Sequence, residues 1–140
     1  MSENSYKATV KYAGDEFFIG MPPSGHAQVI DIKGDRHAAP TPVEMLLVAV
    51  AGCTAADVIS ILLKKRQDVT DYTVEITGTR AGEHPRKFLT FHAHHIVHGR
   101  GVSDKAVADA IELSDMKYCS VAATVRPTAE ITTSYEIIEV

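Results

Sequence analysis

The sequence predicts an α+β fold, and the order of its apolar segments supports that prediction. Short alternating segments fill the N-terminal third, one long apolar helix follows, and two long strands, a helix and a closing strand come after it. The connections are short and hairpin-like, which favours α+β over a doubly wound sheet. A chain of 140 residues, 45% of them hydrophobic, suits a single domain over residues 1–140.

The N-terminal third is expected to form an antiparallel meander. Apolar residues alternate with polar ones over residues 6–12, and a Gly-Asp turn at 14–15 follows. Residues 17–19 are a second apolar run, the turn residues at 22–25 interrupt the chain again, and residues 29–32 are the third strand.

The clearest local signal is the start of a long helix. Thr41 can be the N-cap, Pro42 occupies the favoured first helical position, and Glu44 completes a capping box. The helix should run to about Lys65, and it is apolar nearly all round as far as Ala56. Such a helix is expected to be buried, either centrally in the fold or in an interface.

The rest of the chain reads as two strands, two helical pieces and a strand. The strands are expected at 73–78 and 88–97, a short helical piece at 119–125, and the last strand at 131–137. Ser103 should cap an amphipathic helix whose inward residues are Val107, Ala110, Ile111 and Met116.

Charge and hydropathy exclude several classes of partner. A formal net charge of −4 gives no electrostatic footprint for nucleic acid or an anionic membrane. The segment 1–11 lacks the apolar core of a signal peptide, and the apolar stretch 45–56 is too short to span a bilayer. We therefore expect a cytoplasmic protein with no nucleic-acid or membrane partner.

The two cysteines are the residues most suited to redox or nucleophilic chemistry. In a reducing compartment they are no disulfide framework, so they are either inert core thiols or redox-active ones. Cys53 lies in the long helix beside Ala51 and Gly52, which leave space for a reactant or another backbone. Cys119 opens the short helical piece, where backbone amides would lower a thiol pKa.

The segments around both cysteines resemble the OsmC/Ohr family. TPVEMLLVAVAGCTAADVISILLKKRQDV is similar to its central helix, SDMKYCSVAATV to its second-cysteine helix, and ITTSYEIIE to its last strand. The meander fits too, so the resemblance covers essentially the whole chain and is closest to the less-studied OsmC-like branch. It implies an intertwined homodimer with antiparallel sheets around the long central helices, and active sites at the interface.

The resemblance also implies an activity, the reduction of organic hydroperoxides without a cofactor. Cys53 would attack the peroxide and become a sulfenic acid, and Cys119 would condense with it to a disulfide. A dithiol reductant would then reset the pair.

The sequence departs from the family at the groups that assist the attacking thiol. The family uses an arginine from the N-terminal strands, where this chain has Asp15 and Glu16. Arg36 is either its substitute or a solvated loop charge. The family's glutamate falls at Val43, so Glu44 either approaches a cysteine of the partner chain or only caps its own helix.

Other polar residues have alternative roles. Asp57 lies one turn after Cys53, where it would raise the pKa of a neighbouring thiol, bind a polar ligand, or find a backbone or solvent partner. Three histidines on or just after the strand at 88–97 should share one face: His92, His94 and His98. His95 should face the opposite side. The shared face suits solvent contact better than a metal site. No metal is therefore expected.

Three functions remain open from the sequence. The first is a thiol peroxidase, favoured by both cysteines. The second is a non-catalytic member of the same fold that binds a small apolar or acyl ligand at the dimer interface, favoured by the missing arginine. Thiolate-based hydrolysis ranks last, because no general base is evident near the nucleophile.

Overall fold

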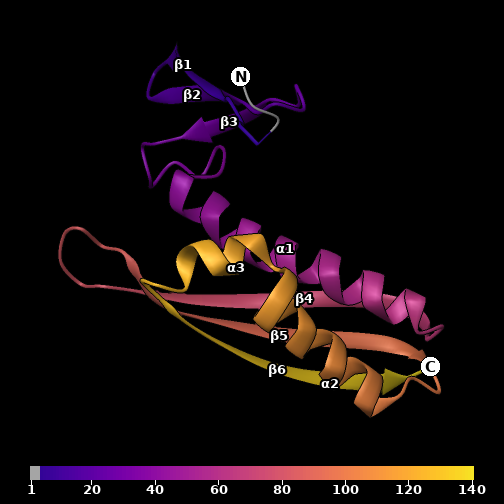
Figure 1. The fold of residues 1–140 in the computed structure, drawn as a ribbon. Coiled ribbons are helices and arrows are strands. Elements are labelled where there is room, and N and C mark those ends of the chain that lie inside the picture. The colour runs from indigo at the N-terminus through magenta and orange to yellow at the C-terminus, as the bar shows by residue number, and fades with distance from the viewer. Residues whose placement is uncertain (1–3) are drawn as a thin grey trace. The chain divides into compact units, whose positions relative to one another are not determined.

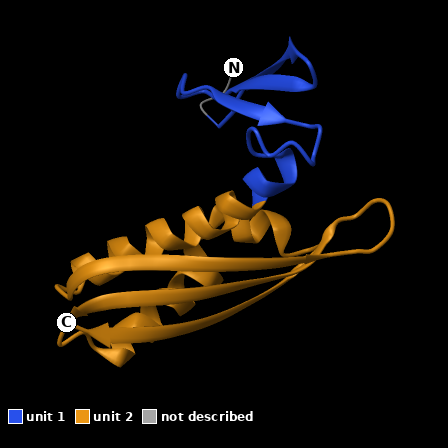
Figure 2. Ribbon diagram, turned by 180° about the vertical axis from the view of Figure 1, so that it is seen from behind, with its two compact units in different colours: residues 1–46 blue, residues 47–140 orange. Residues whose placement is uncertain are grey.

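The computed structural model describes residues 4–140, which form the predicted α+β arrangement (Figure 1). The chain divides into two compact units, residues 1–46 and residues 47–140, and the boundary falls within the long helix (Figure 2). The single domain over residues 1–140 therefore stays a prediction.

The first unit contains the predicted meander. Strands β1 (Thr9–Gly14), β2 (Phe17–Met21) and β3 (Gln28–Asp31) pair antiparallel in that order. Within residues 4–46 only Ile30 and Asp31 are buried. The apolar side chains of this sheet are largely exposed. Such exposure is unfavourable, because a sheet normally covers at least one of its faces with a packed layer.

The second unit is built on a sheet in the order β4–β5–β6. β4 (Asp68–Arg80) and β5 (Phe88–Arg100) form a long antiparallel pair, whereas β6 (Glu130–Glu139) runs parallel to β5. The prediction of antiparallel sheets thus holds for β1–β2–β3 and for β4–β5, but it is wrong for the pair β5–β6. The helical segment between β5 and β6 returns the chain to the end where β5 begins, and such a crossover produces a parallel pair.

Four helical elements belong to this architecture. They are α1 (Pro42–Lys64), α2 (Asp104–Leu113), the π-helical turn η1 (Ser114–Tyr118) and α3 (Ser120–Val125). In the second unit the helices lie on one face of the sheet, as the opposite views of Figures 1 and 2 show. Ser103 caps α2 as predicted, because its side chain accepts a hydrogen bond from the amide of Ala106.

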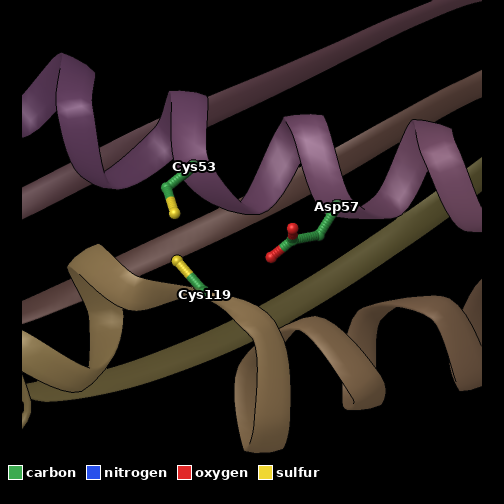
Figure 3. Close-up of side chains that lie close together, drawn as sticks. All are labelled: Cys53, Asp57 and Cys119. Atoms are coloured by element: carbon green, nitrogen blue, oxygen red, sulfur yellow. The ribbon is translucent and has the colours of Figure 1, made fainter. Parts of the chain in front are cut away.

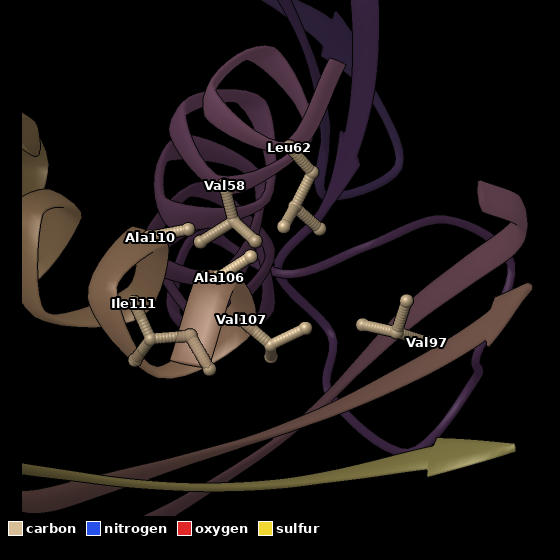
Figure 4. Packing of buried hydrophobic residues seen from close by; sticks show 7 residues of the cluster. All are labelled: Val58, Leu62, Val97, Ala106, Val107, Ala110 and Ile111. Atoms are coloured by element: carbon tan, nitrogen blue, oxygen red, sulfur yellow. The ribbon is translucent and has the colours of Figure 1, made fainter. Parts of the chain in front are cut away.

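The core of the second unit lies between these helices and β5. Alternate residues of β5 face inward, which gives the strand a strict period of two. Figure 4 shows the larger cluster, in which α1, α2 and β5 meet: Val58, Leu62, Val97, Ala106, Val107, Ala110 and Ile111. A second cluster holds Val50, Phe91 and Ala129, with Val121 and Val125 of α3 packed against it.

The long helix is less buried in this chain than its sequence predicts. Only Val50, Val58 and Leu62 are buried in α1, while Val48 is 68% and Leu63 58% exposed. By length and mean hydropathy α1 could cross a membrane, so the apolar stretch is longer than residues 45–56 indicated. Core helices of globular proteins meet the same length and hydropathy criteria. The packing of the buried side of α1 on the sheet and on α2 is what such a core helix shows.

Met116 is not inward, as the helical periodicity had predicted. It is 75% exposed, because the α-helical winding ends at Leu113 and the wider π-turn that follows changes the direction of the next side chains.

Candidate active site

The structure brings Cys53 and Cys119 together, with Asp57 beside them. Cys53 and Asp57 are four residues apart on α1 and share a face, and Cys119 is the N-cap of α3. One ligand atom from each, the two Sγ atoms and a carboxylate oxygen, all lie within 4.8 Å of one another. Figure 3 shows the two thiols pointing toward each other and the carboxylate turned toward the same space.

The local fold of residues 114–122 positions Cys119. Its backbone amide donates to the carbonyl of Ser114 at 2.9 Å, which closes the π-turn. Its Sγ accepts a hydrogen bond from the amide of Ala122 at 3.4 Å, as an N-cap side chain does. The sulfur is thus held at the start of α3, and only 4% of the residue is exposed.

The electrostatic effect on Cys119 is opposite to the sequence-based expectation. Burial, and then the contact with Cys53, raise the pKa of the Cys119 thiol to about 11, and the charge of Asp57 acts in the same direction. The amide of Ala122 does lower that pKa, but one hydrogen bond does not offset the loss of water around the sulfur. Cys119 is therefore a protonated thiol at neutral pH.

Asp57 has both a structural partner and a place beside the thiols. The hydroxyl of Ser114 donates to its Oδ2 at 3.0 Å, and Ser114 is completely buried. The hydroxyl of Thr54 lies 3.0 Å from the Ser114 oxygen and extends this network. No sequence pattern indicated Ser114 and Thr54 as site residues, since they are 60 positions apart.

Arg36 is engaged within the first unit. Its Nε and Nη2 donate to the carboxylate of Asp31 at 3.0 and 2.9 Å, and its Nη1 donates to Asp15 at 2.9 Å. Its guanidinium also lies over the ring of Phe17, 3.8 Å from the centroid. The ion pair holds the pKa of the buried Asp31 carboxyl well below its usual range. These contacts order the loop after β3, and a role of Arg36 at Cys53 stays a prediction.

Glu44 forms the capping box that the sequence indicated as its alternative role. Its Oε1 accepts from the amide of Thr41 at 2.9 Å, and the Thr41 hydroxyl accepts from the amide of Glu44 at 3.2 Å. An approach of Glu44 to a cysteine of a partner chain stays a prediction.

The histidines divide between the two faces of β5 as predicted. His95 faces inward, is fully buried, and its Nδ1 lies 2.7 Å from the hydroxyl of Tyr72. On the opposite face, His92 and His94 both contact the hydroxyl of Ser134, at 2.8 and 2.7 Å. These partners account for His92 and His94, whereas, among the described residues, Nε2 of His95 and Nδ1 of His98 are buried without a hydrogen-bond partner.

His95 should make stability depend on pH. Burial, followed by the charges of His94 and His92, lowers its pKa from 6.5 to about 4. Between these values the unfolded chain binds the proton and the folded chain does not, so stability falls as pH decreases from 6.5 to 4. The loss should not exceed about 3 kcal/mol. Unfolding by urea at pH 7 and pH 4.5 measures it. His95→Gln should reduce the difference, and an unchanged difference would contradict this assignment.

Comparison with known proteins places this chain in a described family. The sequence profile of the OsmC-like protein family matches residues 33–134. Protein YhfA of Escherichia coli K12 is 47% identical over 133 residues, which are 94% of this chain and 98% of that protein. A hypothetical protein from Aquifex aeolicus has a similar crystal structure, with 28% identity and a TM-score of 0.87 over 98% of each chain.

A more distant solved structure shares the fold. The organic hydroperoxide resistance protein OhrB of Bacillus subtilis is 10% identical, with a TM-score of 0.64 over 96% of this chain and all of that one. The arrangement of strands around a long helix is therefore common to this chain and to that protein.

Proposed function

The chain belongs to the OsmC-like protein family, and on that premise we propose that it reduces organic hydroperoxides with Cys53 and Cys119. The observation that carries the proposal is the proximity of the two sulfurs, which lie within 4.8 Å of each other. A distant structural neighbour, OhrB, is named for organic hydroperoxide resistance and supports the choice of substrate class.

The roles of the two cysteines follow from their exposure. Cys53 is partly exposed and Cys119 is buried, so Cys53 is the thiol that a hydroperoxide can reach. Its thiolate attacks one peroxide oxygen, the O–O bond breaks, and the alcohol leaves after taking up a proton. The Cys119 sulfur then attacks the sulfenic acid at Cys53, which releases water and forms the disulfide. A dithiol returns two electrons and two protons, and no cofactor takes part.

The test is the reaction of the reduced protein with cumene hydroperoxide and a dithiol such as dithiothreitol. The proposal requires one alcohol per hydroperoxide consumed and loss of both free thiols when the dithiol is left out. Thiols that persist after many equivalents would contradict it. We expect the reaction in the cytoplasm, where dithiol reductants are available.

A second candidate function is a non-catalytic one, in which the fold binds a small apolar or acyl ligand at a dimer interface. The observation in its favour is that the charged group beside the thiols is the carboxylate of Asp57, and a negative charge disfavours a reactive thiolate. The cation Arg36, which could have favoured a thiolate, pairs with Asp31 and Asp15 instead. Under this function the thiols do not react with hydroperoxide, so the same experiment separates the two.

A homodimer is the proposed assembly, because an exposed apolar side of α1 needs cover. Val48→Glu would place an unpaired carboxylate in that interface, at a cost of about 3–5 kcal/mol. Dimerisation should weaken by roughly a hundredfold or more. Light scattering during size exclusion should give twice the mass of one chain for the natural protein and a shift toward one chain for the variant.

Met116→Glu is the matched control, since it changes an exposed apolar side chain on η1 rather than α1. It should leave the dimer intact. A natural protein with the mass of one chain at high concentration would contradict the proposed assembly.

A further inference from the structure

Cys53, Asp57 and Cys119 carry the donor atoms that thiophilic divalent cations prefer. Two sulfurs and a carboxylate oxygen lie within 4.8 Å of one another (Figure 3). In a tetrahedral zinc site with bonds of about 2.0–2.3 Å, neighbouring ligand atoms are about 3.3–3.8 Å apart. Binding a cation would require the three atoms to move to that spacing from their present separations, which do not exceed 4.8 Å. We propose that these residues form a binding site for a divalent cation of the zinc type.

The charge of the cluster suits a cation. Each of the three ligands is negative when deprotonated, and across residues 4–140 no lysine, arginine or histidine forms an ion pair with Asp57. The hydrogen-bond partner of Asp57 is instead the neutral Ser114. A divalent cation would neutralise the negative charge of the two thiolates, which burial and the neighbouring carboxylate of Asp57 otherwise disfavour.

The surroundings of Asp57 are those of an oriented metal ligand. Ser114 donates to Oδ2 at 3.0 Å and is itself fully buried beside Thr54, so a buried hydrogen bond fixes one oxygen of the carboxylate. Hydrogen bonds of this kind orient ligating carboxylates in metal sites. A carboxylate oxygen of Asp57 lies within 4.8 Å of both sulfurs, where it could bind the same cation.

One member of the proposed site, Asp57, also borders a surface cavity. Asp57 lines a surface cavity of 430 Å³ together with Ser60, Lys64 and Tyr118. Three protein ligands leave a fourth coordination position, which a water molecule can fill.

Binding would be an exchange of protons for metal and involves no electron transfer. Two thiol protons are released to solvent, two metal–sulfur bonds and one metal–oxygen bond form, and both sulfurs stay reduced. Because the sulfurs are then occupied, the cation and a hydroperoxide exclude each other. Metal binding itself does not depend on the proposed peroxidase activity.

The experiment is a titration of the full-length, reduced and metal-free protein with Co²⁺ without oxygen, followed by displacement with Zn²⁺. One cobalt per chain should bind, with a near-ultraviolet thiolate-to-cobalt charge-transfer band that Zn²⁺ removes. Cys53→Ser and Cys119→Ser should each lose most of the band. Asp57→Asn keeps both thiols and should bind at least roughly 10–100-fold more weakly, the range found for disturbed metal ligands.

Asp109→Asn is the matched control, because it removes a carboxylate that pairs with Lys105 on the surface of α2. It should bind cobalt as the natural protein does. Circular dichroism checks each fold, and Ser114→Ala, with an expected roughly 10–100-fold loss, replaces Asp57→Asn if that variant does not fold. Absence of the charge-transfer band, or equal affinity in Asp57→Asn and the natural protein, would overturn the proposal.

Hydroperoxide turnover is measured on the metal-free protein in parallel. Turnover without cobalt binding refutes only the metal site, and cobalt binding without turnover refutes only the peroxidase.

Discussion

Cys53→Ser is expected to abolish the proposed hydroperoxide reduction, with a fall in rate of about three orders of magnitude or more, as in enzymes that lose their nucleophile. The hydroxyl of serine is not ionised at neutral pH and cannot form a sulfenic acid. Cys119 cannot replace Cys53, because it is only 4% exposed and desolvation keeps it protonated. Consumption of cumene hydroperoxide in the presence of dithiothreitol measures the effect.

Cys119→Ser is the informative counterpart, since it should stop the reaction at a later step. One equivalent of hydroperoxide should still be consumed, and a sulfenic acid should accumulate at Cys53, where dimedone labelling and mass spectrometry detect it. The opposite pattern, a trapped sulfenic acid in Cys53→Ser, would reverse the roles of the two cysteines. Equal activity of both variants and the natural protein would refute the dithiol mechanism.

The local features of the site could be predicted from the sequence because they depend on near neighbours. The capping box of Thr41 and Glu44 needs only a spacing of three residues, and the shared face of Cys53 and Asp57 needs only four. The position of Cys119 at the start of α3 followed from the same kind of pattern.

The features that sequence could not give depend on distant contacts. The bond from Ser114 to Asp57 joins residues 57 positions apart, and the parallel pairing of β6 with β5 depends on where the crossover returns the chain. The direction of the Cys119 pKa shift was also missed. A helix start predicts a lowered pKa, but the burial of the sulfur, followed by its contact with Cys53, raises it.

The second large effect is expected from Phe91→Ala, which should lower the free energy of unfolding by about 3–5 kcal/mol. Phe91 is 1% exposed and packs with Val50 of α1 and Ala129, and its ring centroid is 4.6 Å from that of Phe88. Its removal leaves a cavity between β5, α1 and α3, which cannot all move inward to fill it. Urea unfolding at a fixed protein concentration measures the change, since a dimer makes stability depend on concentration.

The same substitution should also weaken the coupling of the two cysteines. Val50 is three residues before Cys53 on α1, and Val121, which packs on the Phe91 cluster, is two residues after Cys119. A looser cluster therefore lets the two sulfurs separate, so disulfide formation should slow even where the protein is still folded. Leu89→Ala, at a 42% exposed position two residues away, is the control and should change stability by no more than about 1 kcal/mol. Equal losses in the two variants would show that the Phe91 cluster does not hold α1 and α3 together.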